Sequence, residues 1–295
     1  MPISRRDFLK MAGVGAGALA APVAVKEAEA APLVADEAAS MLYDASLCVG
    51  CRACQTACKR RADLPHETDA QTLYEMPRYL SADTWTIIQL YQDENEQSFV
   101  KHQCMHCIEP ACVSVCPVAA LEKTENGPVV YHAERCIGCR YCMAACPFGI
   151  PKSQWEEPLP LIQKCDFCAD RQANGEAPAC GEACPTGALI FGKRKDMLGT
   201  AKGRLAADPS FVQHIYGETE AAGTSMLYIS KVAFDKLGFP EVADTNFAKI
   251  TWPYMLAVPG VVGVMVTLST AIYFITRRKN KNNNNNNQNH NGKEG

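Results

Sequence analysis

The sequence predicts an α+β protein of short strands and helices, followed by one C-terminal transmembrane helix. Sixteen of the 295 residues are cysteine, and they fall into four groups that leave only short segments for secondary structure. Residues 252–275 carry no charge and are numerous enough to span about 30 Å of hydrocarbon. Apolar residues make up 47% and charged residues 21%, a globular balance that excludes disorder of the whole chain.

Residues 1–30 are predicted to be a cleaved export signal. Ser-Arg-Arg-Asp-Phe-Leu-Lys at 4–10 precedes an uncharged run rich in Gly and Ala at 11–25, and Ala-Glu-Ala at 28–30 is a cleavage pattern. Paired arginines indicate the twin-arginine export machinery, and we expect cleavage after Ala30. The alternative, a retained anchor, requires a longer apolar run.

Short elements are expected around the cysteines. Residues 85–91, 128–131 and 189–191 are predicted strands, because they alternate apolar and polar residues or are rich in β-formers. Residues 118–122 are expected to form a single helical turn after Cys116-Pro117. His102, His106 and Trp85 lie near the cysteine motifs, and we predict surface or packing roles for them.

Residues 252–275 are predicted to be a membrane anchor. The alternative, a buried core helix, would show a polar face, and this segment offers only Thr, Ser and Tyr. Arg277, Arg278 and Lys279 follow at once, and the positive-inside rule places them in the cytoplasm. The body is then expected on the periplasmic side of a single-pass protein. The Asn-rich segment 276–295 is expected to be a disordered cytoplasmic tail.

The cysteines are spaced as metal ligands. The first and third groups read C-x2-C-x2-C-x3-C, the second C-x2-C-x4-C-x3-C-P and the fourth C-x2-C-x11-C-x3-C-P. The sixteen residues are Cys48, Cys51, Cys54, Cys58, Cys104, Cys107, Cys112, Cys116, Cys136, Cys139, Cys142, Cys146, Cys165, Cys168, Cys180 and Cys184. At four thiolates per cluster they predict four 4Fe-4S clusters, with the last cysteine of a group ligating the neighbouring cluster.

Zinc binding, disulfide formation and c-type haem attachment are the alternative uses of these cysteines. Zinc ribbons separate their C-x2-C pairs by longer stretches, and disulfides do not require this spacing. A c-type haem requires the motif C-x-x-C-H, and no C-x-x-C pair in the sequence is followed by His. Cluster assembly requires reduced thiols, which the cytoplasm supplies, and the twin-arginine route carries folded cargo. Iron-sulfur clusters therefore agree with the export signal.

Over residues 41–197 the chain resembles the four-cluster iron-sulfur subunits of membrane-associated oxidoreductases. This family includes the electron-transfer subunits of formate dehydrogenase, dimethyl sulfoxide reductase and polysulfide reductase. The resemblance is greatest to its hydrogenase-2 operon branch. It is carried by MLYD at 41–44, LCVGC at 47–51, QCMHC at 103–107, CVSVCPV at 112–118 and CRYCM at 139–143.

The resemblance implies two nested bacterial-ferredoxin-like two-cluster units. Residues 41–103 and 160–200 would form a discontinuous outer unit around an inserted unit at 104–159, with 201–251 as a C-terminal extension. The implied ligand sets are Cys48, Cys51, Cys54 and Cys184; Cys165, Cys168, Cys180 and Cys58; Cys104, Cys107, Cys112 and Cys146; and Cys136, Cys139, Cys142 and Cys116.

The resemblance further implies an electron-transfer subunit rather than an enzyme, and the sequence shows no nucleophile, paired carboxylate or nucleotide loop. Expected partners are a catalytic subunit, for which a nickel-iron uptake hydrogenase is favoured, and a quinone-reactive integral membrane subunit. A molybdenum or tungsten enzyme such as formate dehydrogenase is the alternative catalytic partner, and a zinc-ribbon scaffold is a distant alternative function. The formal net charge is −3, and the acidic body argues against nucleic acid as a partner.

Overall fold

The computed structural model describes residues 36–75, 77–245 and 247–291. The chain divides into two compact units, of which one is Ala30–Lys249 and the other combines Met1–Glu29 with Ile250–Gly295. All sixteen cysteines belong to the first unit. The predicted leader and its cleavage site lie outside the described residues.

A three-stranded sheet forms the centre of the cysteine-containing unit. Its strand order is β8 (Leu189–Lys193), β1 (Ala39–Asp44) and β9 (Met226–Ile229). β1 pairs antiparallel with β8 and parallel with β9. Since β1 has partners on both sides and is buried almost throughout, it is the core strand of the unit.

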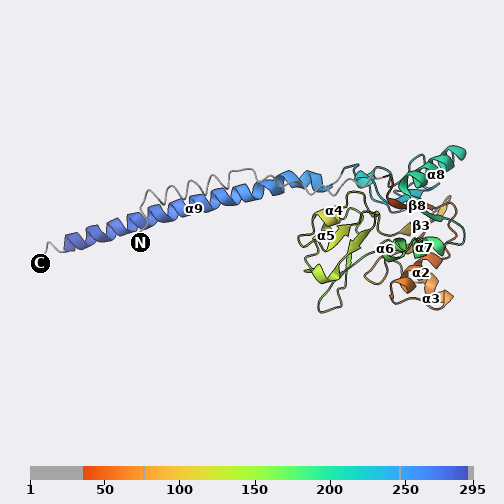
Figure 1. Cartoon of the computed structure of the whole chain (residues 1–295), viewed down its shortest axis with the longest axis horizontal. Coiled ribbons are helices and arrows are strands. Elements are labelled where there is room, and N and C mark those ends of the chain that lie inside the picture. The colour runs from red at the N-terminus through yellow and green to blue at the C-terminus, as the bar shows by residue number, and fades with distance from the viewer. Residues whose placement is uncertain (1–35, 76, 246, 292–295) are drawn as a thin grey trace. The chain divides into compact units, whose positions relative to one another are not determined.

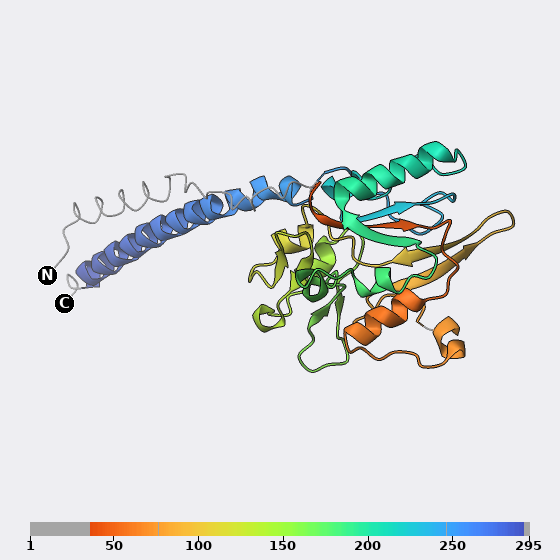
Figure 2. The ribbon, with the colours of Figure 1, turned by 45° about the vertical axis from the view of Figure 1, so that its right-hand side comes forward.

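The two faces of β1 pack against different structures, as alternation along a strand requires. Leu42 packs against Met197 and Leu205 of α8 (Arg194–Ala207), which lies along one face of the sheet (Figures 1 and 2). Met41 and Tyr43 point to the opposite face, where the core also includes cysteine side chains. The sheet therefore separates a helix-covered face from a thiol-containing face.

Residues 201–251 are an integral part of this unit, although the sequence suggested an extension. They supply β9, whose four side chains are at most 1% exposed. The backbone N–H of Ser225 donates to the carbonyl of Met105 at 3.1 Å, and that of Ile108 to Gly223 at 2.9 Å. The segment thus joins the sheet to the loop of the second cysteine group.

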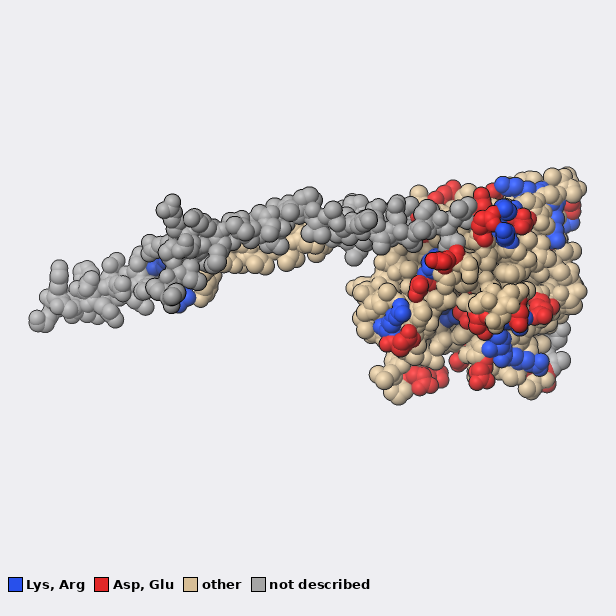
Figure 3. Space-filling model, viewed as in Figure 1, with Lys and Arg blue, Asp and Glu red and all other residues tan. Residues whose placement is uncertain are grey.

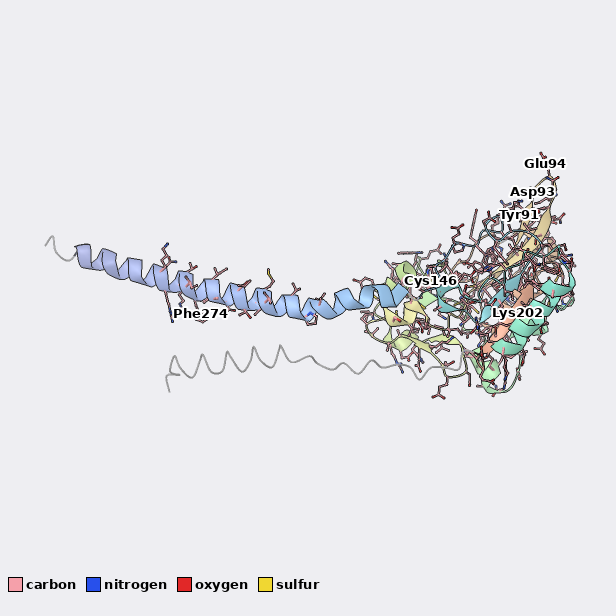
Figure 4. All side chains as sticks on the ribbon, turned by 90° about the horizontal axis from the view of Figure 1, so that it is seen from above. Tyr91, Asp93, Glu94, Cys146, Lys202 and Phe274 are labelled. Carbon is pink, nitrogen blue, oxygen red and sulfur yellow. The ribbon has the colours of Figure 1, made fainter. Side chains whose placement is uncertain are left out.

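Three antiparallel hairpins account for the remaining strands. They are β2 (Ile87–Gln92) with β3 (Gln97–His102), β4 (Leu121–Lys123) with β5 (Val129–Tyr131), and β6 (Lys152–Ser153) with β7 (Ile162–Gln163). The strands predicted at 85–91, 128–131 and 189–191 are confirmed, with shifts of one or two residues at their ends. Asp93 and Glu94 lie at the turn of the first hairpin and point away from the unit, whereas Tyr91 on β2 packs partly against the core (Figure 4).

The helical turn predicted at 118–122 is wrong. Ala119 adopts a left-handed conformation with φ of 49°. Leu121 then pairs with Tyr131 in the β4–β5 hairpin. A partner strand outside the local segment therefore decides its conformation, and local propensity does not report that pairing.

The other helices of the unit are short, and several contain cysteines. They are α2 (Ala53–Arg61), α3 (Ala70–Glu75), α4 (Ala111–Ser114), α5 (Tyr141–Ala145), α6 (Ala169–Ala173) and α7 (Ala179–Glu182), with 3-10 turns at Ala133–Arg135 and Glu220–Ala222. On the face that Figure 3 shows, Lys and Arg are interspersed with Asp and Glu. This face therefore shows no continuous basic area.

The second unit contains α9 (Phe247–Asn291), which includes one helix segment long and apolar enough to cross a membrane. That segment, Ala257–Asn280, has a mean hydropathy of 1.9 and overlaps the anchor predicted at 252–275. The helix continues to Asn291, whereas disorder was expected from residue 276. Residues 276–291 contain no Pro or Gly to end the helix.

Candidate metal centres

All sixteen cysteines are free thiols, so the structure places no disulfide among them. Seven are buried, eight are partly exposed and Cys139 is exposed. The family resemblance implies four ligand sets for these thiols. We name them site 1 (Cys48, Cys51, Cys54, Cys184), site 2 (Cys165, Cys168, Cys180, Cys58), site 3 (Cys104, Cys107, Cys112, Cys146) and site 4 (Cys136, Cys139, Cys142, Cys116).

Site 1 has the clearest enclosure. All four of its cysteines line one cavity of about 300 Å³, a volume that includes the solvent-facing mouth. Tyr43, Ile88 and Leu189 are among the other lining residues. Cys184 comes from the fourth cysteine group and the other three from the first, so the cavity joins cysteines more than 120 positions apart in the sequence.

The pKa shifts of Cys107 and Cys142 agree with the implied membership of sites 3 and 4. Burial raises the pKa of Cys107 well above its ordinary value, and Cys104, Cys146 and Cys112 raise it further. Burial likewise raises the pKa of Cys142 to about 11, with Cys116, Cys136 and Cys139 as the thiols that add to it.

At site 2, neighbouring thiols likewise add to the rise in pKa that burial causes. Burial raises the pKa of Cys58 to about 12, and Cys180 and Cys168 are the thiols that contribute. Burial also raises the pKa of Cys165, with Cys58 and Cys180 among the contributors. Cys58 of the first group therefore lies with the three cysteines of the fourth.

Thiols of different sites also influence one another's pKa. Burial raises the pKa of Cys54 to about 12, and Cys180 of site 2 adds more to it than Cys48 and Cys51 do. Cys104 of site 3 adds to the rise at Cys165 of site 2. The pKa of Cys112, raised to about 12 mainly by burial, is also affected by Cys142 of site 4. Thiols assigned to different sites therefore lie near one another.

The loops that carry the thiols repeat one backbone conformation. Gly50 and Arg52 in the first group have φ of 70° and 57°, and Gly138 and Arg140 in the third have 69° and 62°. A Cβ on Gly50 would lie 2.4 Å from the ring of Phe99, so both its conformation and its surroundings require glycine.

The second and fourth groups use side-chain-bearing residues at the position of these glycines. His106 has φ of 46° and Phe167 has 59°. Only a few per cent of residues other than glycine adopt positive φ, so two of them at equivalent positions indicate that the loop geometry is required. The four groups share this turn despite their unequal spacing.

Backbone N–H groups point at several sulfurs. Ala120 N–H donates to Cys116 Sγ at 3.1 Å, and Phe167 N–H to Cys165 Sγ at 3.4 Å. At Cys184, burial raises the pKa, but hydrogen bonds from the backbone of Leu189, Thr186 and Ala188 outweigh it and lower the pKa overall. Such donors stabilise negative charge on sulfur.

The donor sets fit iron-sulfur clusters. Burial holds the pKa of Cys54 and of Cys58 at about 12, so these thiols ionise at neutral pH only when a cation replaces the lost solvation. A tetrahedral zinc ion would hold its sulfurs roughly 3.8 Å apart. Among the described residues, no group of three or more His, Cys, Asp or Glu side chains is close enough together to hold a single metal ion.

Three lysines lie near the thiols, of which Lys101 and Lys164 are buried and Lys123 is partly exposed. Lys101 is 0% exposed and Lys164 is 5% exposed, and Lys123 lies beside Cys107 and Cys104. Burial lowers the pKa of Lys123 to about 8. Lysine is usually a surface residue, and the sequence gave no sign of these positions.

The histidines and the tryptophan that were predicted to pack do so. His106 is fully buried and stacks on Phe167, and His102 packs against Phe239. Trp85 packs at the edge of a small core and donates from its indole N–H to the carbonyl of Ala82 at 2.7 Å.

Comparisons with known proteins agree with this architecture. Residues 95–194 match the family model of the 4Fe-4S dicluster domain, and residues 2–22 match that of the twin-arginine translocation pathway signal sequence. A protein of Nitratidesulfovibrio vulgaris is 40% identical over 289 residues, covering 94% of this chain and 78% of the relative.

Two further relatives have informative names. The hydrogenase-2 operon protein HybA of Escherichia coli O157:H7 is 36% identical over 283 residues, 83% of this chain and 86% of the relative. The iron-sulfur subunit of the nitrate-inducible formate dehydrogenase of Escherichia coli K12 is 39% identical over 197 residues, 64% of this chain and 66% of the relative. The chain therefore belongs to the family of 4Fe-4S electron-transfer subunits that includes HybA and the formate dehydrogenase iron-sulfur subunits.

Proposed function

We propose that the chain conducts electrons between a catalytic subunit and a quinone-reactive membrane subunit through four 4Fe-4S clusters. The observation that most directly supports this proposal is the cavity that Cys184 lines together with Cys48, Cys51 and Cys54, as the implied ligand sets require. Each cluster would supply one-electron redox chemistry, and neighbouring clusters allow transfer in short steps. The chain itself has no substrate site in this proposal.

The protein contributes the ligands and their surroundings. The sixteen cysteines would hold the clusters, one at each of sites 1 to 4, in two nested ferredoxin-like units. Backbone N–H groups such as that of Ala120 stabilise the charge on sulfur. Apolar side chains such as Ile88 and Leu189 limit access of water to site 1.

Export and anchoring determine where this transfer takes place. The twin-arginine signal supports export of the folded body to the periplasmic side of the cytoplasmic membrane. The apolar helix segment Ala257–Asn280 supports a single-pass anchor. The basic residues Arg277, Arg278 and Lys279 support a cytoplasmic C-terminus. The clusters would then lie on the side where a periplasmic catalytic subunit docks.

A nickel-iron uptake hydrogenase is the catalytic partner that we propose. The relative named for the hydrogenase-2 operon aligns over 86% of its length, compared with 66% for the formate dehydrogenase subunit. A molybdenum or tungsten enzyme such as formate dehydrogenase is the second candidate. Nickel in the complex that co-purifies from solubilised membranes is the expected result, and molybdenum or tungsten in its place would reject the hydrogenase assignment.

The clusters themselves are tested on the anaerobically purified full chain. We expect iron and acid-labile sulfide at about four atoms each per four cysteines, broad absorbance near 400 nm typical of 4Fe-4S clusters, and paramagnetic signals after reduction with dithionite. A colourless protein that contains zinc would instead support a zinc-ribbon scaffold. Removing the iron is expected to unfold the cysteine-containing unit, because the clusters occupy much of its interior.

A further inference from the structure

Lys101 is a fully buried lysine in the cysteine-containing unit. It lies on β3 opposite Ile88 of β2, and its side chain is 0% exposed. Its Nζ donates a hydrogen bond to Thr86 Oγ1. None of the ion pairs among the described residues includes Lys101. A buried ammonium is costly unless negative charge compensates it, so its surroundings must supply that charge.

The compensating groups are thiols. Cys180, Cys54, Cys58 and Cys165 all raise the pKa of Lys101, and together they outweigh burial, which lowers it. Cys54 belongs to site 1, and the other three belong to site 2. Ile88, which lies opposite Lys101, packs in one core cluster with Cys54 and Cys180. Lys101 therefore lies beside thiols assigned to both sites.

Other cations near the thiols are arranged differently. Arg61 at site 2 is paired with Asp166 at 2.6 Å and with Asp170, so its charge is compensated locally. Lys123, beside site 3, donates to the carbonyl of His106 at 3.2 Å, and burial lowers its pKa to about 8. Lys101 combines complete burial, a hydroxyl as its polar partner and thiols from two sites.

We propose that Lys101 is a positioning residue whose ammonium raises the reduction potentials of the clusters held at sites 1 and 2. This inference rests on the proposed function. One-electron reduction gives a cluster one additional negative charge, and Lys101 keeps its proton, so no proton moves with the electron. A fixed positive charge in a poorly solvated interior favours that reduced state. The effect is local to the two sites that Lys101 faces.

The test is a redox titration of the full-length holo-protein, followed by paramagnetic resonance. Lys101→Met removes the charge and keeps a side chain of similar length. We expect the reduced-to-oxidised ratio of two clusters to fall at least tenfold at a fixed potential, a shift of about 59 mV for one electron. The other two clusters should not change. Lys101→Arg should restore the wild-type potentials.

A matched control is Lys236→Met. Lys236 lies in the segment after β9, is exposed, and pairs at 2.7 Å with Glu96 at the turn of the β2–β3 hairpin. The same loss of charge there is screened by solvent and is expected to leave all four potentials unchanged. Equal shifts of all four clusters in Lys101→Met, or no shift at all, would overturn the inference.

Loss of clusters from the variants would also be decisive. If Lys101→Met and Lys101→Gln lose iron but Lys101→Arg retains it, the charge serves to retain the clusters rather than to set their potentials, and the inference fails. If all three lose iron, the position serves packing and the inference fails. A wild-type protein without four clusters would refute the proposed function itself, whereas an unshifted variant with four clusters refutes only the role of Lys101.

Discussion

The imidazole of His106 stacks on the ring of Phe167, with centroids 4.7 Å apart and planes inclined by 18°. Each is the residue before the second cysteine of a C-x2-C pair, and each has positive φ. The backbone N–H of Val129 donates to His106 Nδ1 at 3.0 Å, so the proton of the neutral ring lies on Nε2. This stack joins the loop of site 3 to that of site 2.

Replacing His106 should accelerate cluster loss. His106→Leu leaves the buried N–H of Val129 without its acceptor, at a cost of about 1–3 kcal/mol, and removes the stack. We expect cluster absorbance to decay about tenfold faster in guanidinium chloride, since 1.4 kcal/mol corresponds to a factor of ten. His66→Leu, at an exposed position, is the control. Equal decay in both variants would contradict the structural role of the stack.

Cys184→Ser tests the membership of site 1. Cys184 lines the same cavity as Cys48, Cys51 and Cys54, and so its loss should damage the cluster held by the first group. The cluster of Cys165, Cys168 and Cys180 should persist, which cluster-by-cluster spectroscopy of the holo-protein can measure. Damage restricted to that second cluster would refute the crossed arrangement.

Arg204→Met should destabilise the central sheet. Arg204 on α8 pairs with Asp44 at the end of β1 at 2.7 Å, and the side chain of Asp44 is only 3% exposed. Removing a hydrogen bond to a buried charge costs roughly 1.5–3 kcal/mol. Lys231→Met breaks the exposed pair with Asp208 and should cost less than about 1 kcal/mol. Denaturation of the two holo-proteins side by side measures this difference, and similar losses would argue against a special role for the α8–β1 contact.

Replacing Arg5 and Arg6 with lysine should prevent export. Twin-arginine recognition depends on the arginine pair, so holo-protein with intact clusters is expected to accumulate in the cytoplasm. Cell fractionation followed by iron analysis checks this outcome. Undiminished export of the double variant would show that residues 1–30 act as a different kind of signal.

The sequence predicted local features well and tertiary ones poorly. The strands at 85–91, 128–131 and 189–191 have alternating or β-rich composition, which acts over a few residues, and the structure contains them. The helical turn at 118–122 was wrong because β4 forms by pairing with β5. Lys101 was missed, because its burial depends on the packing of β3 against cysteines from two distant groups.

Sequence alone determined the number and spacing of the cysteines, the export signal and the apolar helix, because each of these depends on residue type and on short distances along the chain. Only the tertiary structure shows that Cys184 shares a cavity with Cys48, and that Lys101 is buried near thiols of the first and fourth groups. The physical reason is that Cys184 reaches Cys48, and Lys101 reaches Cys180, through packing between segments that are far apart in the chain.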